Sequence, residues 1–132
     1  MNKKVVLLTM VSFLLVAAVA YTDGREFKGY LSDVMCASAG KDPSGNNLLK
    51  NPEKHTVACM KMASCIASGY GMFIKNDQGN YVFHKFDQKG SDMAKTKILD
   101  VTKKTDNILI EVKGKLQPDG TVIVKHIESE KD

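Results

Sequence analysis

The sequence predicts a mainly β protein of the α+β class, built as a five-stranded OB-like Greek-key barrel. Two observations support this prediction. Apolar and polar residues alternate with a period of two in five separate segments, which is the pattern of half-buried strands. Helix signals interrupt these segments twice, between strands 1 and 2 and between strands 3 and 4. Five strands with a helix between the third and the fourth are the element order of an OB-type barrel.

The N-terminal segment resembles a targeting signal rather than part of the domain. Lys3 and Lys4 precede an uncharged, mostly apolar run over residues 5–20, which ends in the small-residue cleavage pattern Ala-Val-Ala. The run is shorter than the roughly 20 apolar residues of a membrane-spanning helix. We therefore expect a cleaved secretory signal at 1–20 and a single domain at 21–132, exported to the periplasm or secreted. A retained N-terminal anchor is the alternative.

The first strand is predicted over residues 27–33, with Phe27 and Leu31 on its apolar face. A loop rich in turn-forming residues follows at 41–47. The sequence Asn-Pro-Glu at 51–53 is typical of a helix start, since Asn caps the first turn, Pro fits it, and the acid faces the positive end of the helix dipole.

The second half of the chain predicts two hairpins separated by a short helix. This helix is expected from Ser91 or Asp92 through Leu99, because either residue is a good N-cap. The hairpin turns contain Gly, Asn, Asp and Pro, which adopt the backbone angles that tight turns require. The predicted elements are strands at 71–75, 81–86, 108–112 and 122–127, with turns at 76–80 and 118–120.

Composition limits the class of protein. The chain has 132 residues, of which 43% are hydrophobic and 26% charged, so it is not disordered, collagen-like or multi-domain. The net charge of +4 falls once Lys3 and Lys4 are removed, and such a balance does not favour nucleic acid as a partner. The chain has three cysteines, too few for a disulfide-dense miniprotein.

The helix predicted over 51–67 carries most of the chemically versatile side chains. At about 100° per residue, His55, Cys59 and Met62 share one face, and Cys65 lies on the other flank of the same apolar stripe. Cys36 follows the first strand. The sequence therefore predicts a cluster of Cys36, His55, Cys59, Met62 and Cys65.

Helix geometry restricts the disulfides. Cys59 and Cys65 are six residues apart, so in an unbroken helix their Cα atoms are separated by roughly 10 Å. A disulfide requires less than about 7 Å. If the helix is continuous, a bridge must therefore use Cys36, paired with either Cys65 or Cys59. We favour Cys36–Cys65, which leaves the Cys59 thiol beside His55.

The same residues carry a resemblance. The pattern H-T-x-x-C-x-x-M-x-x-C at 55–65, followed by S-G-Y-G at 68–71, resembles a group of short, uncharacterised exported bacterial proteins. The segments G-Y-L-x-D-x-x-C at 29–36 and V-K-G at 112–114 resemble the same group. This similarity covers nearly all of the chain after residue 20. It implies that these positions belong to one module, and it supplies no activity.

The cluster predicts a transition-metal site. Thiolate, imidazole and thioether ligands suit Cu⁺, and cysteine with histidine suits Zn²⁺. Cys36, His55, Cys59 and Cys65 would form a Cys₃His set, whereas His55, Cys59 and Met62 would form a smaller copper set. The spacing is not that of a standard zinc finger. The alternative is that the cysteines and Met62 are structural and that His55 is a buried, hydrogen-bonded side chain.

A second prediction needs no metal. A disulfide-stapled OB-like barrel would bind an oligosaccharide, a peptide or a protein partner on the face of strands 2 and 3. The aromatic residues expected there are Tyr70, Phe73, Tyr81, Phe83 or Phe86. The competing interpretation is that these rings fill the barrel.

An enzyme is not expected. Cys59 and His55 form a possible nucleophile pair, but the sequence offers no evident third residue to orient the imidazole. It also lacks a thioredoxin-type C-x-x-C and a glycine-rich phosphate loop. The sequence thus predicts an exported, non-enzymatic binding or structural module.

Overall fold

A computed structural model describes residues 24–131 of the chain, so the predicted signal segment at 1–20 lies outside the described residues. The core of the fold is one antiparallel sheet of five strands in the order β3-β2-β1-β4-β5. The strands are β1 (Arg25–Asp33), β2 (Tyr70–Lys75), β3 (Tyr81–Lys85), β4 (Leu109–Leu116) and β5 (Val122–Ser129). The α+β, mainly β class predicted from the sequence is confirmed.

The described sheet is open rather than a closed barrel. Its two edge strands are β3 and β5, and no ladder joins them. A single parallel bridge pairs Phe86, just after β3, with Val122 at the beginning of β5. The Asp87 N–H donates to the Val122 carbonyl at 3.1 Å, which holds the two edges together at this point.

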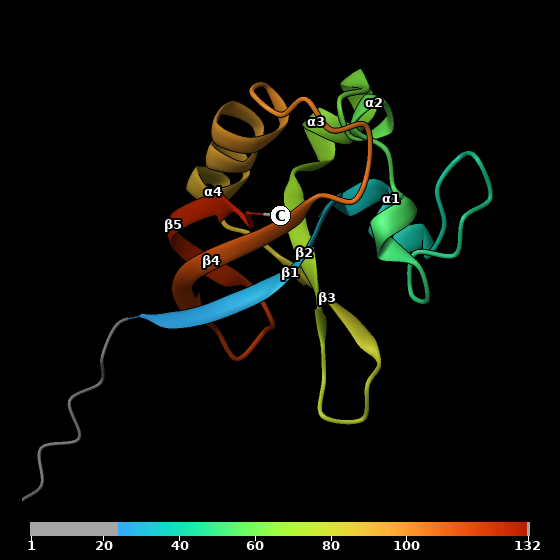
Figure 1. Cartoon of the computed structure of the whole chain (residues 1–132). Helices are drawn as coiled ribbons and strands as arrows, with labels where there is room; N and C mark the ends of the chain where they lie inside the picture. The colour runs from blue at the N-terminus through green and yellow to red at the C-terminus, as the bar shows by residue number, and fades with distance from the viewer. Residues whose placement is uncertain (1–23, 132) are drawn as a thin grey trace, which may run out of the picture.

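The helices are short and lie in two groups. Figure 1 shows α1, α2 and α3 gathered beside one end of the twisted sheet, and α4 next to β5. The helical elements are α1 (Val34–Ala39), the 3₁₀ turn η1 (Pro52–Lys54), α2 (Val57–Met60), α3 (Ala63–Ser68), α4 (Gln88–Met93) and the π-helical turn η2 (Ala94–Leu99). None of the helices described within 24–131 is long and apolar enough to cross a membrane.

The prediction of one continuous helix over 51–67 is wrong. Extended backbone at His55 (φ −69°, ψ 128°), Thr56 (ψ 150°) and Met62 (ψ 145°) divides the segment into η1, α2 and α3. Thr56 begins a new helix, because its hydroxyl accepts from the Cys59 N–H. A hydrogen bond from the sheet holds the short α2 in place: the buried Tyr70 hydroxyl donates to the Met60 carbonyl at 2.7 Å.

Helix α1 was not predicted. It begins because Asp33, the last residue of β1, caps it by accepting from the Cys36 N–H at 2.9 Å. It ends at Gly40, whose φ of 71° is the left-handed conformation that glycine adopts most readily. Cys36 therefore lies on the first turn of a helix and not in a loop.

The predicted helix between strands 3 and 4 is present, but it begins earlier than expected. Asp87 is the cap of α4, since its carboxylate accepts from the Gly90 N–H. Ser91 is instead buried inside α4, where its hydroxyl accepts from the Tyr70 N–H at 3.0 Å. The predicted start at Ser91 or Asp92 missed this cap.

The fold has a main core and a smaller second one. The main core lies between one face of the sheet and the helical segments α2, α4 and η2, and includes Met60, Tyr70, Met72, Phe86 and Ile98. The second core lies on the opposite face of β2 and contains Cys36, Ala37, Leu48, Cys65 and Phe73, with Cys59, Tyr81 and Phe83 packed against it. The predicted Cys/His cluster lies at this second core.

Candidate metal centre

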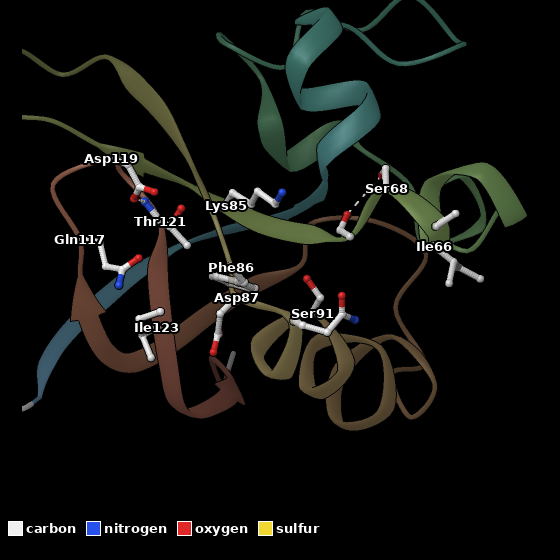
Figure 2. Close-up of a pocket in the computed structure, with 13 residues that line it drawn as sticks. Ile66, Ser68, Lys85, Phe86, Asp87, Ser91, Gln117, Asp119, Thr121 and Ile123 are labelled. Carbon is white, nitrogen blue, oxygen red and sulfur yellow. Dashed lines mark hydrogen bonds between the residues drawn. The ribbon is translucent and has the colours of Figure 1, made fainter.

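An open cavity of about 530 Å³ lies between the end of α3, the start of α4 and the β4–β5 hairpin. Figure 2 shows polar side chains around it, among them Ser68, Lys85, Asp119 and Thr121. Of the aromatic side chains predicted to form a ligand groove, Phe86 lines this cavity and the other four do not.

Those four aromatic residues do not share one face of the sheet. Tyr70 is buried in the main core, whereas Phe73 is buried in the second core, with Tyr81 and Phe83 partly buried beside it. The Phe73 and Phe83 rings are tilted against each other, with centroids 5.2 Å apart. This packing fits rings that fill the fold better than rings that form a stacking platform.

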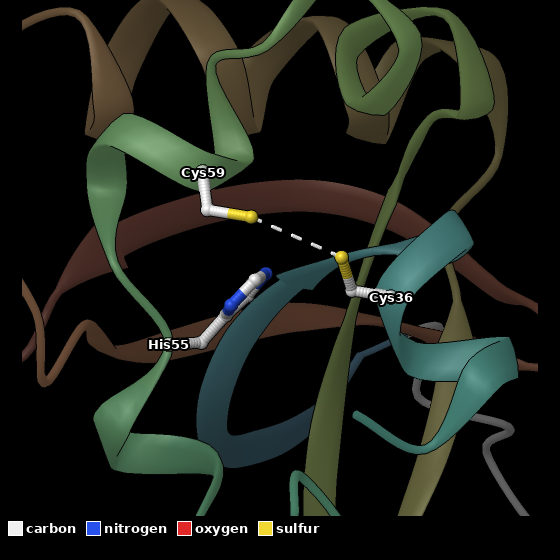
Figure 3. A group of neighbouring side chains, drawn as sticks. All are labelled: Cys36, His55 and Cys59. Carbon is white, nitrogen blue, oxygen red and sulfur yellow. Dashed lines mark hydrogen bonds between the residues drawn. The ribbon is translucent and has the colours of Figure 1, made fainter. Parts of the chain in front are cut away.

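The second core brings three metal-ligating side chains together. Figure 3 shows Cys36 from α1, Cys59 from α2 and His55 from the extended segment between η1 and α2, pointing toward one another. The Cys36 and Cys59 Sγ atoms are 3.9 Å apart. One donor atom from each of the three residues lies within 4.8 Å of the other two.

A second donor group overlaps the first. Donor atoms of Asp33, Cys36 and Cys65 also lie within 4.8 Å of one another, so Cys36 belongs to both groups. Burial and the charge of the nearby Asp33 carboxylate raise the pKa of the Cys65 thiol. Four donor-bearing side chains therefore lie around Cys36: Asp33, His55, Cys59 and Cys65.

His55 lies between two buried carboxylates. Its Nε2 atom donates to Asp33 Oδ1 at 2.7 Å, and its Nδ1 atom lies 3.5 Å from Asp42 Oδ2 without forming a hydrogen bond. The side-chain exposures of His55 and Asp33 are 1% and 0%. Within the described part of the chain, Nδ1 is a buried polar atom without a hydrogen-bond partner. Such an atom is unfavourable unless it gains a ligand.

The loop after α1 positions Asp42. The Asp42 carboxylate accepts from the Asn46 N–H at 3.0 Å and from the Asn46 side-chain amide at 2.8 Å. The Leu48 N–H donates to the Gly40 carbonyl at 3.0 Å, which closes the loop, and the Leu48 side chain is buried in the second core. The turn-rich loop predicted from the sequence is thus folded compactly against His55.

Both carboxylates are held ionised. Burial raises the pKa of Asp33, but hydrogen bonds from His55 and the Cys36 N–H outweigh burial and lower its pKa below the usual value. For Asp42, burial is likewise outweighed by the hydrogen bonds from Asn46 and by the nearby His55 imidazole, and its pKa is also lowered. The site therefore has two buried negative charges before any thiol loses a proton.

The thiols have the opposite tendency. Burial raises the pKa of Cys36, of Cys59 and, to about 11, of Cys65, and the charge of Asp33 adds to each shift. Without a bound cation the three thiols stay protonated at neutral pH. A cysteine nucleophile requires a lowered pKa, so this environment does not activate Cys59.

Two predictions about the cluster need revision. Met62 was expected on the face of His55 and Cys59, but it caps α3 with its side chain 51% exposed, because the helix is broken there. The predicted Cys36–Cys65 disulfide is absent, since all three cysteines are free. The Cα separation of roughly 10 Å that excluded a Cys59–Cys65 disulfide assumed a continuous helix, so that exclusion no longer holds.

Sequence reasoning missed Asp33 and Asp42 as members of the site. Asp33 lies three residues before Cys36 at the end of a strand, a position typical of a helix cap, and this signal was available. Asp42 lies in a turn-rich loop, where an acid is ordinary. Its contact with His55 depends on tertiary packing.

The donor set can hold a cation. Thiolate sulfur and imidazole nitrogen are preferred ligands of Zn²⁺ and Cu⁺, and a carboxylate beside the imidazole is a common supporting group in metal sites. No protein-family model, no curated protein and no solved structure matches this chain. The site itself therefore carries the functional argument.

Proposed function

We propose that this chain is an exported, non-catalytic module that binds one thiophilic transition-metal ion, Zn²⁺ or Cu⁺. The ligands are drawn from Cys36, His55, Cys59 and Cys65. The observation that carries the proposal is the pair of overlapping donor groups that share Cys36 at a largely buried site.

The surroundings of His55 support a metal role. Metal-ligating histidines commonly donate their second ring N–H to a carboxylate, which fixes the orientation of the imidazole. Asp33 stands in that relation to His55, at 2.7 Å. Asp33 also offers a carboxylate oxygen beside Cys36 and Cys65, so it is either a supporting group or a ligand.

Charge supports the same conclusion. The ionised Asp33 and Asp42 carboxylates share a single buried imidazole, which balances at most one of their two charges. Buried charges are stable when they are paired or coordinate a metal. A cation bound among the thiols would supply the missing positive charge, and it would replace the thiol protons.

Metal binding is tested on the full-length chain, purified under anaerobic, reducing conditions. Zn²⁺ and Cu⁺ are titrated separately against a competing chelator, and bound metal is measured by elemental analysis. We expect one equivalent of metal in the wild type and at least about tenfold weaker binding in Cys36→Ser and His55→Gln, since loss of a supporting or ligating group typically weakens affinity by this factor or more.

A matched control is His126→Gln, because His126 is exposed on β5, away from the cluster, and pairs with Glu128. Its affinity should equal that of the wild type. Absence of bound metal in folded wild-type protein with three free thiols would refute the proposal, as would equal affinities in all four proteins.

We also propose that the sheet is a partly open OB-type barrel. Such barrels have five strands and need not close completely. The strand order and the parallel bridge between Phe86 and Val122 support this assignment. Slow amide exchange at Asp87, comparable to that in β1, is expected if this contact closes the barrel, and rapid exchange there would contradict it.

A second candidate function is binding of a polar ligand in the 530 Å³ cavity. Its lining combines a cation, the carboxylates of Asp87 and Asp119, hydroxyls and side-chain amides, which suits a neutral, hydroxyl-rich oligosaccharide. Titration of ¹⁵N-labelled protein with a soluble oligosaccharide should shift amide signals at Ser68, Lys85 and Thr121. Lys85→Met should weaken the shifts, and Lys28→Met on β1 should not. Unshifted spectra with a panel of oligosaccharides would reject this function.

Export itself is a sequence-based proposal. It is tested by expressing the full-length chain and sequencing the N-terminus of the recovered protein. We expect Tyr21 as the first residue. Recovery of the intact chain in a membrane fraction would instead support a retained anchor.

A further inference from the structure

We propose that Cys36 and Cys59 form a reversible disulfide, and that this oxidation and metal binding exclude each other. The mutual exclusion rests on the proposed metal function, whereas the disulfide itself does not. The protein would then release its ion when it is oxidised and bind it again when it is reduced.

The geometry selects this pair of thiols. The two sulfur atoms are 3.9 Å apart, and about 2 Å of approach brings them to the length of a disulfide bond. They lie on α1 and α2, two separate short helices joined by a long loop. Small rotations about the side-chain bonds and a slight shift of either helix can therefore close the gap without disturbing the sheet.

Cys65 lies beside a different group. Its Sγ atom is within 4.8 Å of an oxygen of the buried Asp33 carboxylate, which accepts from His55 and from the Cys36 N–H. A disulfide to Cys65 would replace a thiol that can donate to this buried carboxylate, which is unfavourable. Cys65 is therefore expected to remain a thiol when the other two are oxidised.

Exposure decides where an oxidant enters. Cys36 is buried, whereas Cys59 is partly exposed at the edge of the second core. The oxidant is a low-molecular-weight disulfide. Cys59 gives up its proton to solvent as its sulfur attacks one sulfur of the small disulfide, which forms a mixed disulfide and expels one thiolate. Cys36 then loses its proton in the same way, attacks Cys59 Sγ and expels the second thiolate, and both expelled thiolates take up a proton. Two protein thiols lose two protons and two electrons, and the small disulfide becomes two thiols.

Shared atoms explain the exclusion. Cys36 and Cys59 are both members of the donor group that includes His55. Sulfur in a disulfide no longer carries the negative charge that makes a thiolate a metal ligand. One pair of atoms therefore serves either the ion or the covalent bond.

The first arm of the test uses metal-free, full-length protein and oxidised glutathione. Free thiols are counted, and cross-linked peptides are identified by mass spectrometry without reduction. We expect the count to fall from three to one, with a Cys36–Cys59 peptide. Cys65→Ser is the matched control and should form the same bond. Three persisting thiols in folded protein, or a bond that includes Cys65, would overturn the inference.

The second arm adds Zn²⁺ at about ten times its dissociation constant. Only the metal-free fraction can react, so oxidation should slow about tenfold. Oxidised protein should bind no Zn²⁺ until a reducing agent is added. An unchanged oxidation rate with bound Zn²⁺ would refute the exclusion. If no metal binds at all, the proposed function and the exclusion both fail, while the disulfide result of the first arm stands independently.

Discussion

His55 Nε2 donates a hydrogen bond to Asp33 Oδ1 at 2.7 Å between two side chains that are almost completely buried. Hydrogen bonds to charged groups contribute about 1.5–3 kcal/mol each. We expect Asp33→Asn to lower the free energy of unfolding of the metal-free protein by about 2–3 kcal/mol. The measurement is urea denaturation followed by circular dichroism.

The molecule offers a matched exposed pair as a control. His126 Nε2 lies 3.4 Å from Glu128 Oε2, and both side chains are more than half exposed. Exposed pairs contribute little, so Glu128→Gln should change the free energy of unfolding by less than about 1 kcal/mol. Equal effects of the two substitutions would contradict a structural role for the buried pair.

The Tyr70 hydroxyl gives a pH-dependent prediction. Burial raises the pKa of Tyr70 to about 12, and the charge of Asp33 adds to the effect. In the unfolded chain, tyrosine ionises near pH 10. The unfolded state therefore loses this proton first, and the stability that the neutral hydroxyl contributes is complete below pH 10 and is lost as the pH rises toward 12.

Tyr70→Phe isolates this contribution. At pH 7 the variant should be less stable than the wild type by about 1–3 kcal/mol, because the buried Met60 carbonyl loses its donor. The difference between the two proteins should shrink above pH 10. Tyr81→Phe, on the partly exposed β3, is the comparison and should not lower the stability at pH 7.

Two neighbouring methionines should behave in opposite ways. Met60 is 0% exposed in the main core, whereas Met62 is 51% exposed. Met60→Ala should lower the free energy of unfolding by about 2–5 kcal/mol. Met62→Ala should change it by no more than about 0.5 kcal/mol. Metal affinity should also be unaffected in Met62→Ala, and a marked loss would restore Met62 as a copper ligand.

Native thiol accessibility should rank the cysteines. A brief pulse of iodoacetamide is expected to modify Cys59 first, since Cys36 and Cys65 are buried. Peptide mapping after the pulse gives the extent of reaction at each position. In urea all three should react alike. Faster modification of Cys65 than of Cys59 in folded protein would show that the second core is arranged differently.

The strands were predictable because their signals are local. Alternating apolar residues at Phe27 and Leu31, and again in β4 and β5, indicate one buried face wherever the strand pairs. Sequence placed all five strands, with errors of up to a few residues at their ends. Whether the sheet closes into a barrel depends on long-range pairing such as that between Phe86 and Val122, so its openness could not be predicted from local sequence patterns.

The candidate site was predictable in part. Cys36, His55, Cys59 and Cys65 were expected to cluster, and the structure brings them together, but by a different route. Local rules favour one helix after Asn51, yet the His55 backbone is extended and its ring lies against Asp33 and Asp42. Those contacts join residues 22 and 13 positions apart, and no local pattern encodes them.

The segment between β1 and β2 leaves and re-enters the sheet at adjacent points. Asp33 and Tyr70 are register partners, and the Val34 N–H donates to the Gly69 carbonyl at 2.9 Å. Because closure of a longer loop adds little entropic cost, residues can be gained or lost between these two points without shifting the strand pairing. The length of the 41–51 loop can thus change without altering the sheet. We expect insertions and deletions among natural variants of this chain to occur first in this loop.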